Sequence, residues 1–344
     1  MGIEVTTEVS NKGFEEWQSF LAEEALLRIT DLNVVYRTER SVANALNGLD
    51  LVIHKGESIG LVGETGAGKT TTALSILNLL PADTAFIEGG TVEFEGKNVG
   101  QMSKSELTEI RGGKIAMIFQ NPLTALNPVF TVGEQISMAL RVQQKMGRKQ
   151  ALERASELLE VVGIAGYRVK DYPFQFSGGM RQRVGIAAAL ACNPMLLIAD
   201  EPTTALDVTI QAQILELMRK LQTQYDASLL MITHNLGIIA ELCQRVAIMY
   251  AGRIIEYGSV EDVFSSPQHP YTYGLIGALP SLEGPRNRLL AIPGTIANPQ
   301  NLPSGCAFHP RCEQCGERCK TEQPRMTHVG NGHFVECFMR ESGN

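Results

Sequence analysis

Short apolar runs alternate along the chain with segments in which apolar residues recur at helical spacing. Four runs have the length and apolar character of buried strands: Ile59–Val62, Lys114–Phe119, Met195–Ala199 and Ser228–Thr233. Residues 70–80, 134–166 and 182–190 read instead as helices. Because strands that alternate with helices form parallel sheets, the pattern predicts an α/β fold.

The N-terminal hundred residues contain three further signals. Ala25–Tyr36 and Leu49–Ile53 read as strands, and Gly89–Gly96 reads as a hairpin. Phe14, Trp17 and Leu21 are spaced i, i+3, i+7 and predict a short amphipathic helix. That helix either packs on the main domain or serves as a docking motif.

From about residue 260 the composition changes. Eight prolines follow within a few dozen residues, and the periodic apolar pattern weakens. This texture predicts an appended, loop-rich segment that does not continue the sheet.

Length and charge narrow the class of protein. A chain of 344 residues predicts two or three domains. The net charge of −7 argues against a nucleic-acid-binding protein, which usually presents a basic surface. No apolar run approaches the length of a membrane span, and the first ten residues lack the features of a secretory signal.

Residues 63–70 form a complete G-x-x-x-x-G-K-[ST] phosphate-binding loop between a predicted strand and a predicted helix. Its members are Gly63, Glu64, Thr65, Gly66, Ala67, Gly68, Lys69 and Thr70. The glycines let backbone N–H groups approach a phosphate, and the helix N-terminus adds partial positive charge. Lys69 would reach the β- and γ-phosphates, and the Thr70 hydroxyl would bind Mg²⁺. The chain is therefore predicted to bind a nucleoside triphosphate.

Two other segments carry candidate phosphate chemistry. Asp200 and Glu201 end an apolar strand, where the first carboxylate would hold Mg²⁺ and the second would polarise an attacking water. The segment that begins at Ser177 opens a helix with small residues, which suits a phosphate at the helix N-terminus.

Taken in order, these segments resemble the ATP-binding cassette (ABC) transporter ATPases. Tyr36 occupies the position of the aromatic residue that stacks on adenine in that family, although it also fits an ordinary strand aromatic. The remaining motif positions follow in the family's order: Gln120 in the Q-loop, Ser177, Gly178, Gly179 and Met180 as the signature, Asp200 and Glu201 as the second acidic motif, Asp207 in the D-loop and His234 as the switch histidine.

Further segments are similar to one subgroup, the ATPase subunits of oligopeptide and dipeptide importers. They are Met180, the run Ala199–Thr209, Gln268–Thr272 and Gly305–Cys312. The resemblance covers about residues 26–340. It implies a P-loop NTPase of ABC type, with a RecA-like parallel-sheet core, an antiparallel β subdomain and a helical subdomain at about 121–185. It places an N-terminal extension at 1–25, the nucleotide-binding domain at 26–260 and a small cysteine-containing domain at 261–344.

The resemblance also implies the role of each residue. Tyr36, Gln120 and residues 63–71, including Thr71, would bind ATP. Thr70 and Gln120, with Asp200 through water, would hold Mg²⁺. Glu201 would be the general base and His234 would contact the γ-phosphate. The signature would act in trans on ATP held by a second ATPase subunit, either a copy or a paralogue.

The subgroup implies the setting as well. We expect two transmembrane permease subunits, an extracytoplasmic peptide-binding protein, and a place on the cytoplasmic face of the plasma membrane. Import of nickel or another metal chelate by the same kind of machine is an alternative. A soluble ABC ATPase that acts on DNA or ribosomes is an alternative of another class, which the acidic charge and the single cassette disfavour.

Five of the seven cysteines fall between Cys306 and Cys337, which in a chain without an export signal indicates metal or redox chemistry. By resemblance, a [4Fe–4S] cluster would be bound by Cys306, Cys312, Cys319 and Cys337. Cys315 is an additional cysteine, and a four-cysteine Zn²⁺ site or no metal at all are the alternatives. Cys192 and Cys243 are expected to be buried core thiols.

Overall fold

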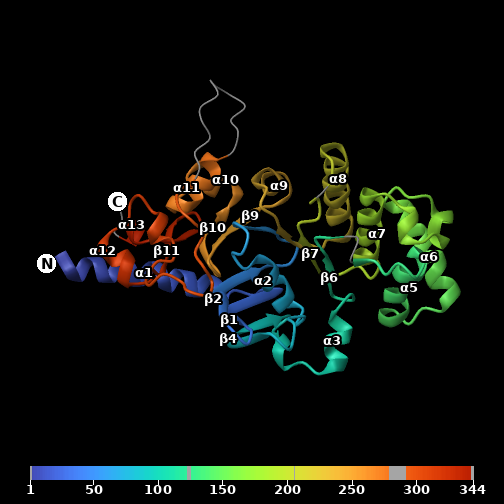
Figure 1. Ribbon diagram of the computed structural model, residues 1–344, viewed down its shortest axis with the longest axis horizontal. Coiled ribbons are helices and arrows are strands. Elements are labelled where there is room, and N and C mark those ends of the chain that lie inside the picture. The colour runs from blue at the N-terminus through green and yellow to red at the C-terminus, as the bar shows by residue number, and fades with distance from the viewer. Residues whose placement is uncertain (1, 122–124, 205, 279–291, 342–344) are drawn as a thin grey trace, which may run out of the picture. The chain divides into compact units, whose positions relative to one another are not determined.

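The computed structural model describes residues 2–121, 125–204, 206–278 and 292–341 (Figure 1). The chain divides into two compact units. The first contains Met1–His54, Ile59–Gly100 and Thr233–Asn344, and the second contains Lys55–Ser58 and Gln101–Ile232.

The first unit contains an antiparallel sheet with the strand order β2-β1-β4-β5. Its strands are β1 (Leu27–Arg37), β2 (Val42–Ile53), β4 (Ala85–Phe94) and β5 (Lys97–Asn98). The hairpin lies later than predicted, because Gly89 falls inside β4 and only Glu95 and Gly96 form the turn. Both turn residues have positive φ, 49° and 72°, which a two-residue type I′ turn requires.

A second run of strands in this unit has the order β11-β12-β10-β9-β3. The strands are β3 (Ser58–Val62), β9 (Arg245–Tyr250), β10 (Arg253–Ser259), β11 (Met326–Gly330) and β12 (His333–Glu336). β3 runs parallel to β9, whereas β10 and β12 are antiparallel to their neighbours.

The expectation that the C-terminal segment leaves the sheet is therefore wrong. β12 pairs with β10 through Tyr257 opposite Phe334 and Glu256 opposite Val335. Phe334 and Val335 are both buried, so these few apolar residues suffice to add a strand after the proline-rich stretch.

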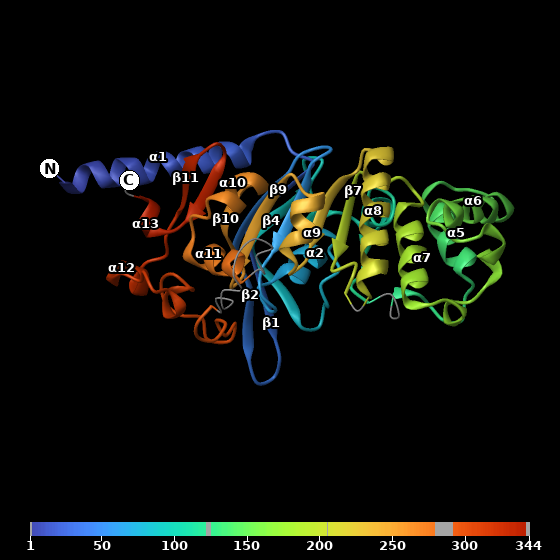
Figure 2. The same cartoon turned by 90° about the horizontal axis from the view of Figure 1, so that it is seen from above.

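The N-terminal helix α1 (Gly2–Ala22) packs on this sheet (Figure 2). Trp17 is buried, and its ring lies 5.8 Å from the ring of Tyr257 and 5.0 Å from that of Phe334. The predicted amphipathic helix is thus confirmed, in its packed rather than its docking form. The other helices of the unit are short: α2 (Lys69–Ile76), α9 (Leu236–Leu242), α10 (Val260–Ser265), α11 (Pro270–Gly277), α12 (Glu317–Thr321) and α13 (Phe338–Glu341).

The second unit contains three adjacent parallel strands, β6 (Ile115–Ile118), β7 (Leu196–Asp200) and β8 (Ser228–Ile232). They match three of the predicted apolar runs, and β7 and β8 are buried along their whole length. The parallel character expected from their composition is confirmed.

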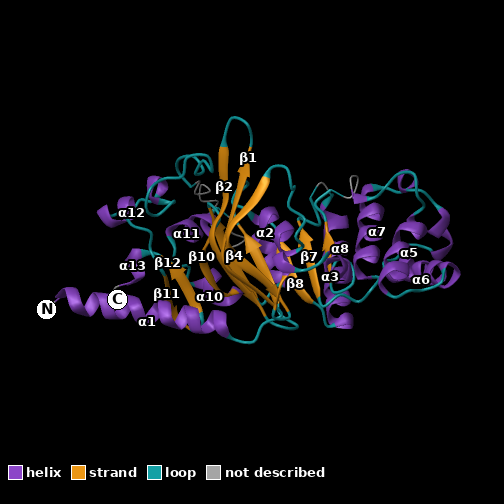
Figure 3. Cartoon of the chain, turned by 90° about the horizontal axis from the view of Figure 1, so that it is seen from below, coloured by secondary structure: helices purple, strands orange, loops and turns teal. Residues whose placement is uncertain are grey.

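The second unit also contains α-helices. They are α3 (Lys104–Ile110), α5 (Val132–Gln143), α6 (Arg148–Val161), α7 (Gly178–Leu190) and α8 (Val208–Tyr225). The predicted helical stretch 134–166 is two helices, because α6 starts afresh after its N-cap Gly147. α5, α6 and α7 contact one another and form a purely helical group (Figure 3). Among the described residues, no helix combines the length and apolarity that crossing a membrane would require.

Candidate functional site: a phosphate loop and a set of hydrolysis motifs

The phosphate loop connects the end of β3 to the start of α2, as predicted. Gly68 is the N-cap of α2 and has φ 109°, a conformation that glycine adopts without strain. A Cβ atom at Gly68 would lie 2.6 Å from the carbonyl oxygen of Ala45, so the neighbouring strand also requires glycine there. Gly66 has φ 83°. Glycines at these two positions therefore let the loop backbone adopt a conformation that other residues would strain.

Lys69 lies inside this loop and is only 7% exposed. Its ammonium donates to the carbonyl oxygens of Gly63 at 2.7 Å and Glu64 at 3.0 Å. Thr70 is exposed in the first turn of α2. The Tyr36 hydroxyl lies 3.5 Å from Oγ1 of Thr71, which places the predicted adenine-stacking residue beside the same helix.

His234 belongs to the same unit as the phosphate loop. It is exposed and follows β8. The N–H of the preceding residue, Thr233, donates to the carbonyl of Leu61 in β3 at 3.3 Å. The predicted switch histidine therefore follows a residue that is bonded to the strand leading into the loop.

In the second unit, the carboxyl ends of β6 and β7 bring together Gln120 and Glu201. The Gln120 amide donates to Oε2 of Glu201 at 2.8 Å. The Thr204 hydroxyl donates to the same oxygen at 2.9 Å, a partner that the sequence did not indicate. Asp200, the last residue of β7, is 3% exposed. The predicted base and Q-loop residue thus touch, and the predicted Mg²⁺ carboxylate lies one residue away.

The signature and the D-loop also meet in the second unit. Ser177 is the N-cap of α7, and its hydroxyl accepts the N–H of Met180. Asp207 is the N-cap of α8, and its carboxylate accepts the N–H of Ile210 at 2.9 Å. A Cβ atom at Gly179 would lie 2.6 Å from Cγ2 of Ile210. The glycine therefore allows the two helix starts to approach closely.

The structure divides the predicted residues between the two units. Tyr36, His234 and the loop residues 63–71 belong to the first unit. The hydrolysis and signature motifs belong to the second: Gln120, Asp200, Glu201, Ser177, Gly178, Gly179, Met180 and Asp207.

Sequence reasoning missed two partners of the phosphate loop. The N–H of Glu64 donates to the Tyr271 hydroxyl at 3.0 Å. The Glu64 carboxylate forms an ion pair with Arg311 at 2.6 Å. Both partners lie in segments that resemble the peptide-importer subgroup but that the sequence did not connect with the phosphate loop, Gln268–Thr272 and Gly305–Cys312.

The cysteine prediction is not supported by the structure. The described residues include all seven cysteines as free thiols and contain no group of three or more side chains arranged to hold a metal ion. Burial raises the pKa of the Cys306 thiol to about 12 and that of Cys337 to about 11. Cys192 and Cys243, expected in the core, are partly exposed, and burial raises the pKa of both.

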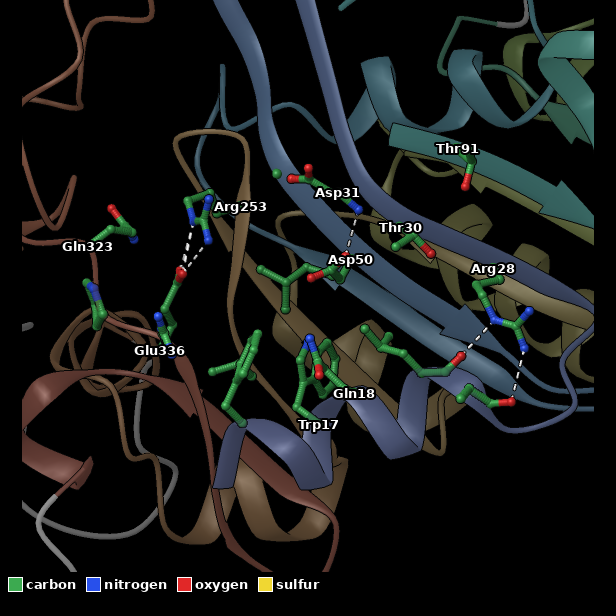
Figure 4. A pocket seen from close by; sticks show the side chains of 18 of the residues that line it. Trp17, Gln18, Arg28, Thr30, Asp31, Asp50, Thr91, Arg253, Gln323 and Glu336 are labelled. Atoms are coloured by element: carbon green, nitrogen blue, oxygen red, sulfur yellow. Dashed lines mark hydrogen bonds and ion pairs between the residues drawn. The ribbon is translucent and has the colours of Figure 1, made fainter. Parts of the chain in front are cut away.

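The first unit also contains a cavity of about 900 Å³ that none of the predicted site residues lines (Figure 4). Its wall includes the ion pair of Arg253 and Glu336, at 2.6 Å, and Asp50 bonded to the N–H of Asp31. Burial raises the pKa of Glu336 and of Asp50, and the Arg253 charge opposes this in both.

Two family models match the chain. The model described as ABC transporter matches residues 46–204. The model described as oligopeptide/dipeptide transporter, C-terminal region, matches residues 255–319. The second match contains both Tyr271 and Arg311.

Curated relatives cover nearly the whole chain. The oligopeptide transport ATP-binding protein AppD of Bacillus subtilis is 46% identical over 318 residues, which are 92% of this chain and 97% of that protein. The dipeptide transport ATP-binding protein DppD of the same organism is 45% identical over 320 residues, 92% of this chain and 96% of that protein.

Solved structures share the fold. A dimeric ATP-binding cassette in a post-hydrolysis state with ADP and phosphate is 28% identical with a TM-score of 0.61, covering 68% of this chain and 98% of that one. CbiO1 of Clostridium perfringens, part of an ABC transporter complex, is 27% identical with a TM-score of 0.60, covering 71% and 92%. The mixed parallel and antiparallel sheets are thus those of an ABC ATPase cassette, and proteins of this family are ATPases. The chain belongs to the ATP-binding proteins of ABC transporters, in the oligopeptide/dipeptide transporter group.

Proposed function

We propose that this chain is the ATP-binding and ATP-hydrolysing subunit that powers the import of dipeptides or oligopeptides through an ABC transporter. The observation that carries the hydrolytic role is the contact between Gln120 and Glu201 at 2.8 Å, at the ends of two parallel strands. The peptide substrate is supported by the C-terminal region and by the names of the relatives.

ATP binding is assigned to the first unit. Lys69 and the backbone of residues 63–71 bind the phosphates. The support is a loop with glycines at positive φ before a helix N-terminus, with the Lys69 ammonium against the loop carbonyls. Tyr36 stacks on adenine and His234 contacts the γ-phosphate.

Hydrolysis is assigned to the acids and the Q-loop. Oxygen donors of the kind Mg²⁺ prefers are available in the Thr70 hydroxyl, the Gln120 side chain and the Asp200 carboxylate. Mg²⁺ held by such oxygens would neutralise charge on the phosphates. Glu201 holds the attacking water and takes its proton, and the bonds from Gln120 and Thr204 orient its carboxylate.

The signature completes a second subunit's site. Ser177, Gly178 and Gly179 present the N-terminus of α7, which suits a phosphate. One chain has one phosphate loop and one signature, so the working unit is a dimer of ATPase subunits. It acts beneath two permease subunits, on the cytoplasmic face of the plasma membrane, and a peptide-binding protein delivers the substrate.

For the C-terminal segment we keep a cysteine-bound centre as a proposal, with [4Fe–4S] ahead of Zn²⁺. Its support is the spacing of Cys306, Cys312, Cys319 and Cys337 in the sequence, together with the electrostatic effect of these thiols on one another's pKa. Burial is the main cause of the raised pKa of Cys306, and charges on Cys319 and Cys337 raise it further.

We also propose the domain boundaries that the resemblance implies, with the nucleotide-binding domain at 26–260 and the C-terminal domain at 261–344.

Uptake measurements test the substrate. In cells that contain the permease subunits, deletion of this chain should abolish uptake of labelled dipeptides and oligopeptides. Wild type should restore it, whereas Glu201→Gln should not. Loss of nickel uptake alone would favour the metal-chelate alternative, and no loss of any uptake would favour an ABC ATPase of the DNA- or ribosome-acting class.

A further inference from the structure

We propose that Arg311 and Tyr271, two residues of the C-terminal region, position the phosphate loop for ATP by holding Glu64. All three residues lie in the first unit. The inference rests on the proposed nucleotide-binding role of the loop and assigns that role two positioning residues outside the ABC transporter match.

The carboxylate of Glu64 is held by a two-bonded ion pair. Nη1 and Nη2 of Arg311 donate to its two oxygens at 2.6 and 3.1 Å. The third side of the guanidinium is also used, since Nε donates to the carbonyl of Pro293 at 2.9 Å. The Arg311 side chain is only 4% exposed and that of Glu64 is 24% exposed, so solvent screens this pair only in part. Such a fork fixes direction as well as distance.

The backbone N–H of Glu64 is held by a second residue. It donates to the Tyr271 hydroxyl, and the Tyr271 ring is fully buried. That ring packs edge-on against Tyr250, with centroids 4.9 Å apart, and against Phe308 at 5.4 Å. Because these two neighbouring rings hold the Tyr271 ring in place, its hydroxyl is a fixed acceptor.

The carbonyl of Glu64 links the residue to Lys69, the lysine of the phosphate loop. It accepts from the Lys69 ammonium at 3.0 Å. All three polar groups of Glu64 are therefore engaged: the carboxylate with Arg311, the N–H with Tyr271 and the carbonyl with Lys69. Lysine ends in a point charge on a flexible stem, so its position depends on the carbonyls that receive it. Releasing Glu64 would loosen one of the carbonyls that hold the Lys69 ammonium, beside that of Gly63 at 2.7 Å.

The C-terminal region is thus part of the nucleotide site. Arg311 ends a short 3₁₀ turn, His309–Arg311, and Tyr271 lies in the first turn of α11. At the other end of the loop, the N–H of Gly252 donates to the carbonyl of Ala67 at 2.9 Å. The loop is therefore anchored on both sides.

The test compares ATPase kinetics and ATP binding of the full chain with its permeases. We expect Arg311→Gln and the isosteric Glu64→Gln each to lower kcat/KM by roughly 10- to 10²-fold, since small misplacements of binding groups have effects of that size. Most of the loss should appear in KM, because the loop holds the phosphates in both ground and transition state. Tyr271→Phe, which removes only the acceptor, should give a smaller loss of the same kind.

A double-mutant cycle shows whether Glu64 and Arg311 affect ATP affinity through their contact with each other. The combined Glu64→Gln and Arg311→Gln variant should lose no more affinity for ATP than either single variant. Arg311→Lys keeps the charge but not the fork, and should remain well below wild type.

Arg318→Gln is the matched control. It breaks another ion pair of the C-terminal region, with the buried Glu341, and among the described residues neither member of that pair bonds the loop. It should lower the melting temperature and leave kcat/KM unchanged. If Arg311→Gln behaves in the same way, or if it and Glu64→Gln both bind ATP as wild type does, the inference is wrong.

Two outcomes separate this inference from the proposed function. If Lys69→Ala still binds ATP, the role of the loop itself fails. If Lys69→Ala abolishes binding but Glu64→Gln and Tyr271→Phe do not weaken it, only the positioning role fails. If Arg311→Gln does not fold, the ATP affinities of Glu64→Gln and Tyr271→Phe, which change fewer atoms, test the positioning role.

Discussion

His269 predicts an acid-sensitive step in the unfolding of the first unit. It is buried at the N-terminus of α11, and its Nδ1 accepts the N–H of Tyr271 at 3.0 Å, so this nitrogen must be unprotonated. Burial lowers the pKa of His269 from 6.5 to about 4, although the nearby Glu256 charge opposes this shift. Glu256 itself accepts the N–H groups of Gln268 and His269 and faces His333.

The direction of the effect follows from proton binding. Above pH 6.5 His269 is neutral whether the chain is folded or unfolded, so its contribution is constant. Between pH 6.5 and 4 the unfolded chain binds a proton that the folded chain does not, and folding stability falls as pH falls. One pH unit corresponds to about 1.4 kcal/mol, so the loss at pH 5 is about 2 kcal/mol and approaches roughly 3 kcal/mol near pH 4.

Urea unfolding at pH 7.5 and pH 5 measures this loss. Trp17 is the single tryptophan and lies in the first unit, so its fluorescence reports on the right part of the chain. His269→Asn is the matched variant, because asparagine also caps a helix but does not titrate. Wild type should lose about 2 kcal/mol more than His269→Asn between the two pH values. An equal loss in the two proteins would refute the reasoning.

Three further predictions follow from the proposed roles. Glu201→Gln should bind ATP but release phosphate about 10²–10⁴ times more slowly, because the positioned base is lost; an unchanged rate in the assembled transporter would contradict the assignment. Lys69→Ala should lose ATP affinity in calorimetry without a large change in melting temperature, and wild-type affinity would count against it. Anaerobically purified protein should contain about four irons, lost in Cys306→Ser and kept in Cys315→Ser; folded, metal-free protein would end the proposal.

The strands, and the strand–loop–helix order around residues 63–70, were predicted correctly because they depend on local patterns. β7 and β8 are continuous apolar runs, and the phosphate loop is one uninterrupted segment between a strand and a helix. The hairpin was misplaced because its turn uses Glu95 at positive φ, a backbone conformation that residues other than glycine rarely adopt. The local pattern favoured the nearby glycines instead.

What sequence missed depends on contacts between distant segments. Glu64 and Arg311 are separated by 247 residues, and Arg253 and Glu336 by 83. No periodicity links such positions, since a charged residue in a loop reads as solvated until its partner is placed. β12 was missed for a similar reason, because a strand of only four residues is recognised by its pairing with β10 rather than by its own pattern.

Two ion pairs, each with one buried partner, indicate what the C-terminal region contributes. A buried pair often adds no more stability than apolar residues of the same volume, because both charges lose their hydration. Its directional bonds do fix geometry, and each pair ties the C-terminal region to a defined place in the first unit. Arg253 bonds Glu336 and the carbonyl of Asn47, whereas Arg311 bonds Glu64 in the phosphate loop. If stability were the main purpose, apolar contacts such as those of Trp17 would serve at both places. The Arg311 fork, which bonds the loop directly, therefore argues that the C-terminal region sets the position of the loop.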